Sequence, residues 1–148
     1  MVSEGLQLVN LLAAAVLTGN ELGTWAVVHP ALHKLPFRDE VRAEQAITRR
    51  YGYFMPGLML LTIVSGFVAA GTLDGEAQTL LFSASGCFTA MLAITLVGNV
   101  PINVRTLGFG EGTEAEWRRL RRRWDLLHLG RIVLDVAGLV LVALAAVE

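Results

Sequence analysis

The stretches GYFMPGLMLLTIVSGFVAAGTL (residues 52–73) and AQTLLFSASGCFTAMLAITLVGNVPINV (residues 77–104) contain no charged side chain. Each exceeds the ~20 residues that an α-helix needs to cross the hydrocarbon core of a bilayer, so both are predicted to be transmembrane helices. Apolar runs at residues 5–29 and 126–147 flank them. The sequence therefore predicts four spans, at about residues 6–29, 53–73, 78–101 and 125–147.

The composition fits one integral membrane domain covering residues 1–148. Hydrophobic residues make up 54% of the chain and charged residues only 17%, whereas soluble domains carry about 25% charged residues. The net charge of −1 gives no overall basic surface for phosphate neutralisation, so nucleic acid is not an expected partner. The expected partners are the lipid bilayer and a lipophilic small molecule, and a homo-oligomer is compatible with the composition.

The basic residues predict an orientation in the membrane. Eleven of the twelve lie between spans one and two or between spans three and four, namely Lys34, Arg38, Arg42, Arg49, Arg50, Arg105, Arg118, Arg119, Arg121, Arg122 and Arg123. The opposite side carries only acidic residues, namely Glu4, Asp74, Glu76 and Glu148. The positive-inside rule therefore predicts a protein of the plasma (inner) membrane, with both basic loops in the cytoplasm and both termini outside.

The connecting segments complete the predicted fold. Residues 36–51 place apolar side chains among charges, which is typical of an amphipathic helix lying at the membrane interface. Thr113 and Glu116 have the spacing of a capping box, so a helix should start there and run unbroken into span four. Pro101 should kink or end the third helix. The predicted fold is an all-α bundle of four transmembrane helices, with an interfacial helix after span one and a long fourth helix extending into the cytoplasm.

The fourth helix carries a polar stripe. Its six members follow one another at spacings of four, three, four, three and four, and are Trp117, Arg121, Trp124, His128, Arg131 and Asp135. These spacings place all six on one helical face. Asp135 lies ~14 Å beyond Leu126, near the membrane centre, where an unpaired charge costs several kcal/mol. The stripe should therefore face the bundle interior, either as a functional site or because Arg131 and Asp135 form an i,i+4 pair that only holds the helices together.

The first and third helices offer matching polar groups. Glu21, Trp25 and His29 recur every four residues in the first helix. An intramembrane carboxylate is a functional-site hypothesis by default, with Arg131 or a histidine as its expected partner, although a purely structural Glu21–Arg131 ion pair is the alternative. In the third helix, Asn99 and Asn103 share a face. Their amides could satisfy backbone groups freed by Pro101 or could bind a substrate oxygen.

These residues resemble a known family. The pattern Asn99-x-Pro101-x-Asn103, followed by Trp117, Arg123-Trp124 and His128-x-x-Arg131, is similar to the signature of the anthrone-oxygenase-like family of small four-helix membrane proteins. Characterised fungal members oxidise anthrones to anthraquinones with molecular oxygen. The resemblance implies a membrane-embedded monooxygenase that oxidises a polycyclic or phenolic lipophilic substrate near the cytoplasmic face, with molecular oxygen as co-substrate.

The sequence offers a candidate residue for each role in that chemistry. An anthrone carries an acidic methylene beside a carbonyl, so the reaction needs a base and donors for the enolate oxygen. His128 is the candidate base, with Asp135 or Glu21 orienting it. The candidate donors to the enolate oxygen are Asn99, Asn103 and Arg131. The candidate flat walls for a polycyclic ring are Trp25, Trp117 and Trp124.

Two other function classes remain open on the sequence alone. His29, His128 and a carboxylate from Glu21 or Asp135 are the parts of a two-histidine, one-carboxylate iron site, and two histidines could equally hold copper or haem in a membrane redox protein. The remaining class is a non-catalytic bundle that binds a lipid or another small molecule.

Overall fold

The computed structural model describes residues 2–148, with side chains described from Glu4 onward, and this part of the chain is helical without a strand. In chain order the elements are α1 (Val2–Gly23), η1 (Thr24–Val28), α2 (His29–Leu32), α3 (Phe37–Ala70), α4 (Gly75–Ile94), η2 (Thr95–Asn99), α5 (Val100–Leu107) and α6 (Glu114–Ala145). The η segments are single π-helical turns that connect α-helices end to end. The chain therefore forms four long rods, namely α1–η1–α2, α3, α4–η2–α5 and α6.

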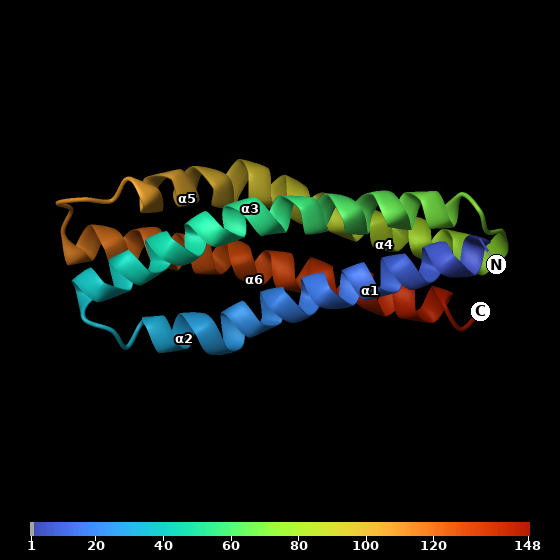
Figure 1. The fold of residues 1–148 in the computed structure, drawn as a ribbon, viewed down its shortest axis with the longest axis horizontal. Coiled ribbons are helices and arrows are strands. Elements are labelled where there is room, and N and C mark those ends of the chain that lie inside the picture. Colours follow the sequence, from blue (N-terminus) through green and yellow to red (C-terminus); the bar gives the residue numbers. More distant parts are fainter. Residues whose placement is uncertain (1) are drawn as a thin grey trace.

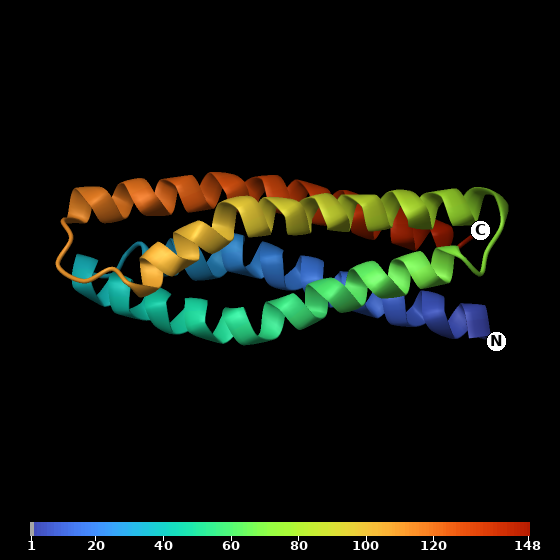
Figure 2. The same ribbon diagram turned by 90° about the horizontal axis from the view of Figure 1, so that it is seen from above.

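The four rods form an elongated bundle with consecutive rods antiparallel (Figure 1). Each rod is long and apolar enough to cross a membrane, so the predicted four-helix transmembrane fold is confirmed. Both termini lie at one end, beside the α3–α4 turn, as the second view also shows (Figure 2). The loops at residues 33–36 and 108–113 lie at the other end, called the basic end below.

The half of the bundle near the termini is packed with apolar side chains. Its buried core includes Leu17, Met59, Phe88 and Val142. Gly66 lets α3 approach α4 closely, because a Cβ there would lie 2.4 Å from the Ser85 Oγ. Among the polar groups in this half, Asn10 Nδ2 donates to the Thr62 carbonyl at 2.8 Å and to Ser65 Oγ at 3.0 Å. This half forms the apolar core of the bundle, and the candidate site residues lie in the other half.

Two prolines place the π-helical turns. The Pro30 and Pro101 rings lack an N–H and clash with the carbonyl four residues earlier, which disrupts the α-helical ladder. The chain adjusts by widening the preceding turn, so that the His29 N–H bonds the Thr24 carbonyl and the Val100 N–H bonds the Thr95 carbonyl. Such turns often occur at functional sites. Pro101 therefore distorts the third rod as predicted but does not end it, and α5 continues to Leu107.

The basic end differs from the prediction in one respect. Residues 37–51 do not form a separate interfacial helix but are the first part of α3, continuous with the second span through Pro56. The physical reason is that Glu40, Val41 and Glu44 are buried inside the bundle, where a helix lying flat on the headgroups would expose its polar face. The Thr113–Glu116 capping box is confirmed, and α6 runs unbroken from Glu114.

Candidate active site

The polar stripe of α6 faces the interior of the bundle, as predicted. All six of its members are buried, namely Trp117, Arg121, Trp124, His128, Arg131 and Asp135. They fall into two groups along the helix axis. His128, Arg131 and Asp135 lie deep in the bundle beside Glu21 of α1, and these four residues are called the inner layer. Closer to the basic end lies the outer layer, defined as His29, His33, Glu40, Glu44, Arg121 and Asp125.

Glu21 is the centre of the inner layer. Arg131 Nη2 donates a short hydrogen bond to Glu21 Oε1. His128 faces the same residue with both ring nitrogens, because Nδ1 lies 3.0 Å from Glu21 Oε2 and Nε2 lies 3.3 Å from the Glu21 carbonyl oxygen. A carbonyl only accepts, so Nε2 is assigned the proton and Nδ1 is left to face the carboxylate. One carboxylate thus joins an arginine and a histidine of α6 to α1.

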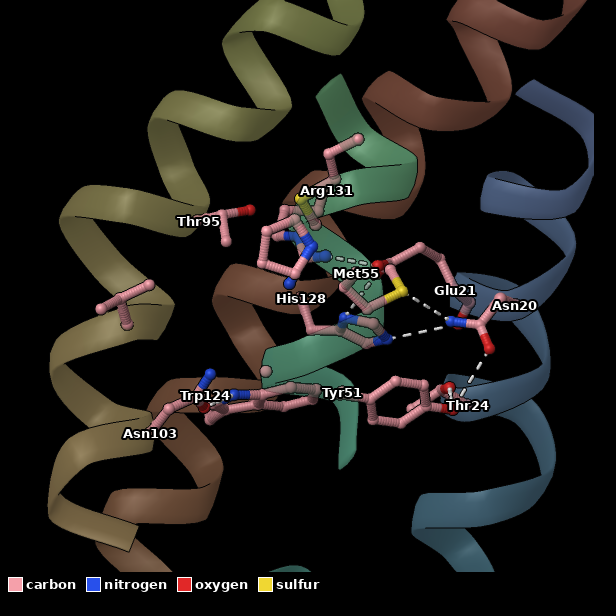
Figure 3. A pocket seen from close by; sticks show the side chains of 14 residues that line it. Asn20, Glu21, Thr24, Tyr51, Met55, Thr95, Asn103, Trp124, His128 and Arg131 are labelled. Atoms are coloured by element: carbon pink, nitrogen blue, oxygen red, sulfur yellow. Dashed lines mark hydrogen bonds and ion pairs between the residues drawn. The ribbon is translucent and has the colours of Figure 1, made fainter. Parts of the chain in front are cut away.

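A cavity of about 120 Å³ adjoins this group, and all four rods contribute to its wall (Figure 3). Its lining residues are Asn20, Glu21, Thr24, Tyr51, Gly52, Met55, Pro56, Met59, Thr95, Val100, Asn103, Trp124, His128 and Arg131. Seven of the fourteen lining residues are apolar or aromatic, and the other seven are polar or charged. This combination is typical of a binding site for a small organic molecule.

Hydrogen bonds fix the polar side chains around the cavity. Tyr51 donates its hydroxyl hydrogen to Asn20 Oδ1 at 3.2 Å and lies 2.9 Å from Thr24 Oγ1. On the opposite side, the Trp124 indole N–H donates to Asn103 Oδ1 at 2.8 Å. Because that bond uses the amide oxygen of Asn103, its Nδ2 remains as a hydrogen-bond donor at the cavity wall. The Trp124 ring also stacks on the His128 ring, with centroids 4.5 Å apart.

The structure places three of the predicted substrate-binding residues elsewhere. Trp25 is 46% exposed on the outside of the bundle, because the π-helical turn at residues 24–28 holds an extra residue and rotates the face that α1 presents. Trp117 is buried nearer the basic end, with its ring centroid 5.0 Å from that of Phe109. Asn99 is buried, and neither of its side-chain polar atoms has a hydrogen-bond partner within residues 2–148.

Asp135 does not orient His128, since Glu21 occupies that position. In the described part of the chain its carboxylate oxygens have no hydrogen-bond partner, and no ion pair joins it to Arg131. The predicted i,i+4 pair is therefore replaced by the Glu21–Arg131 pair, because the arginine points toward α1. The Asp135 backbone carbonyl accepts the Thr18 hydroxyl at 3.3 Å, so the residue still lies at the α1–α6 contact.

Several cavity residues were not predicted from the sequence, including Asn20, Thr24, Tyr51, Met55 and Thr95. A signal for two of them was present. Thr24 and Thr95 each stand six residues before a proline, in TWAVVHP and TLVGNVP. Each threonine begins the π-helical turn that its proline causes, and both line the cavity from opposite rods. Tyr51 and Met55 had no such signal, because an apolar span offers no mark of which face meets a cavity.

The outer layer is built around two pairs with i,i+4 spacing. His29 and His33 flank α2, and Glu40 and Glu44 lie on one face of α3. Arg121 Nη2 lies 3.4 Å from both His29 Nδ1 and Glu44 Oε2.

The predicted metal set His29, His128 and Glu21 spans both layers, with the two imidazole centroids 6.1 Å apart. The Trp124 ring stacks on the His29 ring, with centroids 4.6 Å apart. That metal set stays a prediction.

Comparison with known families matches one model. The model is described as anthrone oxygenase and covers residues 44–141. Searches of curated proteins and of solved structures return no significant match. The matched region contains every cavity residue contributed by α3, η2, α5 and α6, whereas Asn20, Glu21 and Thr24 precede it.

Proposed function

Because the chain belongs to the anthrone oxygenase family, we propose that it is a membrane-embedded oxygenase that oxidises a ring methylene of a polycyclic or phenolic lipophilic substrate with molecular oxygen. The observation that carries the proposal is the cavity in which a buried histidine–carboxylate pair meets the flat face of Trp124. A base, an oxyanion donor and an aromatic wall are the parts that deprotonation of an anthrone requires.

The inner layer supplies the base. With the proton on Nε2, His128 Nδ1 presents a lone pair 3.0 Å from Glu21 Oε2, so this pair of atoms can accept the methylene proton and share it. Arg131 and the Glu21 carbonyl hold the pair in place. The enolate oxygen then receives hydrogen bonds from Arg131 and from Asn103 Nδ2, which the Trp124 bond leaves available. Preorganised donors of this kind stabilise developing charge most strongly where water is excluded.

Molecular oxygen completes the reaction. The deprotonated ring carbon gives its electrons to O₂ and forms a C–O bond, and the proton returned by the base makes this a hydroperoxide. The base then removes the second hydrogen of the same carbon, the C–H electrons form the C=O bond, and the O–O bond breaks with the outer oxygen leaving as water. In sum, a CH₂ group and O₂ give a C=O group and H₂O, so one oxygen atom stays in the product. In this scheme the chain's own residues hold and move the protons, and O₂ is the oxidant.

The size of the cavity limits how a substrate fits. Its volume of about 120 Å³ lies below the ~300–1,000 Å³ of typical ligand pockets and near the ~150 Å³ of a cavity that admits benzene. We therefore expect one ring to enter beside His128, while the remaining rings lie between α3 and α5. The cavity residues there, Gly52, Pro56 and Val100, are exposed on the lipid-facing surface, so entry occurs from the bilayer.

Isotope labelling tests this function. Purified protein in detergent is incubated with anthrone under ¹⁸O₂, and the anthraquinone formed is analysed by mass spectrometry. We expect product formation above that in protein-free micelles, with one ¹⁸O atom in the new carbonyl. A rate equal to that of empty micelles, or a carbonyl oxygen derived from water, would contradict the proposal.

The orientation of the bundle is part of the proposal. With the basic end in the cytoplasm, a cysteine placed at Asp74 in a Cys87→Ser background should react with an impermeant thiol reagent in intact cells. A cysteine at Thr113 should react only after the cells are opened. The reverse pattern would place the basic end and the outer layer outside.

A further inference from the structure

The outer layer brings five possible metal ligands together from three rods. His29 and His33 come from the ends of α2, Glu40 and Glu44 from α3, and Asp125 from α6. One ligand atom each from His29, His33 and Asp125 lies within 4.8 Å of the others. Because i,i+4 spacing places both members of each pair on one helical face, two short motifs converge on one carboxylate of a distant helix.

The potential ligand atoms of the cluster lie close enough together to bind one ion. Asp125 Oδ1 lies 3.7 Å from His29 Nδ1, and Asp125 Oδ2 lies 3.7 Å from His33 Nε2. His33 Nδ1 lies 2.8 Å from Glu40 Oε1. A carboxylate on one imidazole nitrogen fixes the ring and leaves the other nitrogen as ligand, which is the usual second interaction of a metal-bound histidine. His33 therefore offers Nε2 toward Asp125.

Burial and charge also favour the binding of a cation at this cluster. Glu40 and Glu44 are 0% and 2% exposed, and Glu40 Oε2 has no hydrogen-bond partner in the part of the chain that the structure describes. Glu44 Oε1 lies 3.3 Å from His29 Nδ1. With Asp125 the cluster holds three carboxylates. Arg121 is buried beside Glu44, whereas Arg118 lies 3.9 Å from Glu40 and makes its closer contact with Glu114. Buried charges are normally paired or bound to a metal.

We propose that the outer layer binds one divalent transition-metal ion, of which Zn²⁺ is the probe of choice, through His29, His33 and Asp125. Two imidazoles and a carboxylate favour Zn²⁺, Fe²⁺ or Ni²⁺ over the oxygen-seeking Mg²⁺ and Ca²⁺. Bonds of ~2.0–2.1 Å in a tetrahedral site separate ligand atoms by roughly 3.4 Å, so the cluster must contract. His33 and Asp125 can move inward, because their side chains are 34% and 37% exposed. Water fills the fourth position from that side.

The roles of the remaining residues follow from their contacts. Glu40 orients His33. When His29 Nδ1 binds the ion, Arg121 loses its contact with His29 and remains paired with Glu44. This site differs from the inner layer in its ligands, since none of the three proposed ligands belongs to that layer, although the His29 and His128 ring centroids lie 6.1 Å apart. Glu21, His128 and Arg131 take no part in it. The site therefore goes beyond the proposed oxygenase function, and its test does not depend on turnover.

Calorimetric titration with Zn²⁺ tests the site. The full chain, purified in detergent without a histidine tag and stripped with a chelator, should bind one Zn²⁺ per chain and give no comparable signal with Mg²⁺. Asp125→Asn and His33→Ala should each weaken binding at least 100-fold, and Glu40→Gln should weaken it 10- to 100-fold, as loss of an orienting carboxylate does. Asp39→Asn is the matched control beside Glu40. Its side chain is exposed and pairs with Arg42, so binding should be unchanged.

A second measurement keeps the result independent of folding defects. Zn²⁺ should raise the thermal midpoint of the unmodified chain and of Asp39→Asn, because ligands that bind only the folded state stabilise it. It should not raise that of Asp125→Asn. Absence of saturable binding at one ion per chain would overturn the proposal. Wild-type affinity in both His33→Ala and Asp125→Asn would do so too, as would loss of binding in His128→Gln with binding retained in His33→Ala.

Discussion

The two layers of polar residues along α6 solve the same physical problem in different ways. In the inner layer one of the two carboxylates, that of Glu21, faces both Arg131 and His128, and every member of the layer is buried. The outer layer has three carboxylates and two imidazoles, and Asp125 and His33 are partly open to water. Deep in the hydrocarbon, charged groups must find partners within the protein. At the end of the bundle, water supplies part of that stabilisation and an ion can enter.

The largest difference between the layers should appear in turnover. His128→Gln keeps the hydrogen-bonding capacity of the side chain but cannot accept a proton, so anthrone oxidation should fall by 10² to 10⁴, the usual contribution of a general base. Asp39→Asn, at the exposed start of α3, should keep the wild-type rate. Steady-state oxidation assays in detergent give both values. An unchanged rate in His128→Gln would show that the inner layer is structural.

Stability should respond next most strongly, through the buried ion pair. Glu21→Gln or Arg131→Gln leaves its partner charged and buried, and each change should lower the free energy of unfolding by about 3–5 kcal/mol. The double variant should lose less than the sum of the two, because no orphaned charge remains. Denaturant titration of the detergent-solubilised protein measures this cycle. Strict additivity would mean that the two side chains do not interact.

Removing the carboxylate of Asp135 should have the opposite sign. It is 0% exposed and its oxygens lack a hydrogen-bond partner within the described residues, so it carries a desolvation cost of about 1–3 kcal/mol. Asp135→Leu should therefore raise the thermal midpoint in the same detergent. If it lowered the midpoint as much as Arg131→Gln does, Asp135 would be a member of the ion-pair group after all.

The smallest effect is expected at the exposed start of α6. Arg118 and Glu114 form an i,i+4 pair at 2.9 Å, with both side chains about half exposed. Glu114→Gln should change the free energy of unfolding by less than about 0.5 kcal/mol, and 0.5 M salt should remove even that difference. A larger, salt-resistant loss would show that Arg118 depends on Glu114 to reach Glu40.

Periodicity and local chemistry were sufficient for much of this molecule. Two of the four spans follow from uninterrupted apolar runs and the other two from apolar runs that a few polar residues interrupt. The start of α6 follows from Thr113 and Glu116, because a capping box depends only on neighbouring residues. The burial of the α6 stripe also follows from sequence, since a helix has one period and lipid excludes polar faces. His128, Glu21, Arg131, Asn103 and Trp124 were identified as site residues on this basis, and all five line the cavity.

Partner choice was decided only by the tertiary structure. The sequence offered Arg131 two carboxylates, Asp135 four residues along its own helix and Glu21 on another, and the packing of α1 against α6 selected Glu21. The sequence did not predict the π-helical turn before Pro30, which moved Trp25 outward and Thr24 inward. The segment that contains Glu40 and Glu44 was predicted to lie at the membrane interface, but in the folded bundle both side chains are buried. The sequence by itself determined which faces had to leave the lipid, because that depends on one helix at a time, whereas which groups meet depends on the relative rotation and depth of several helices.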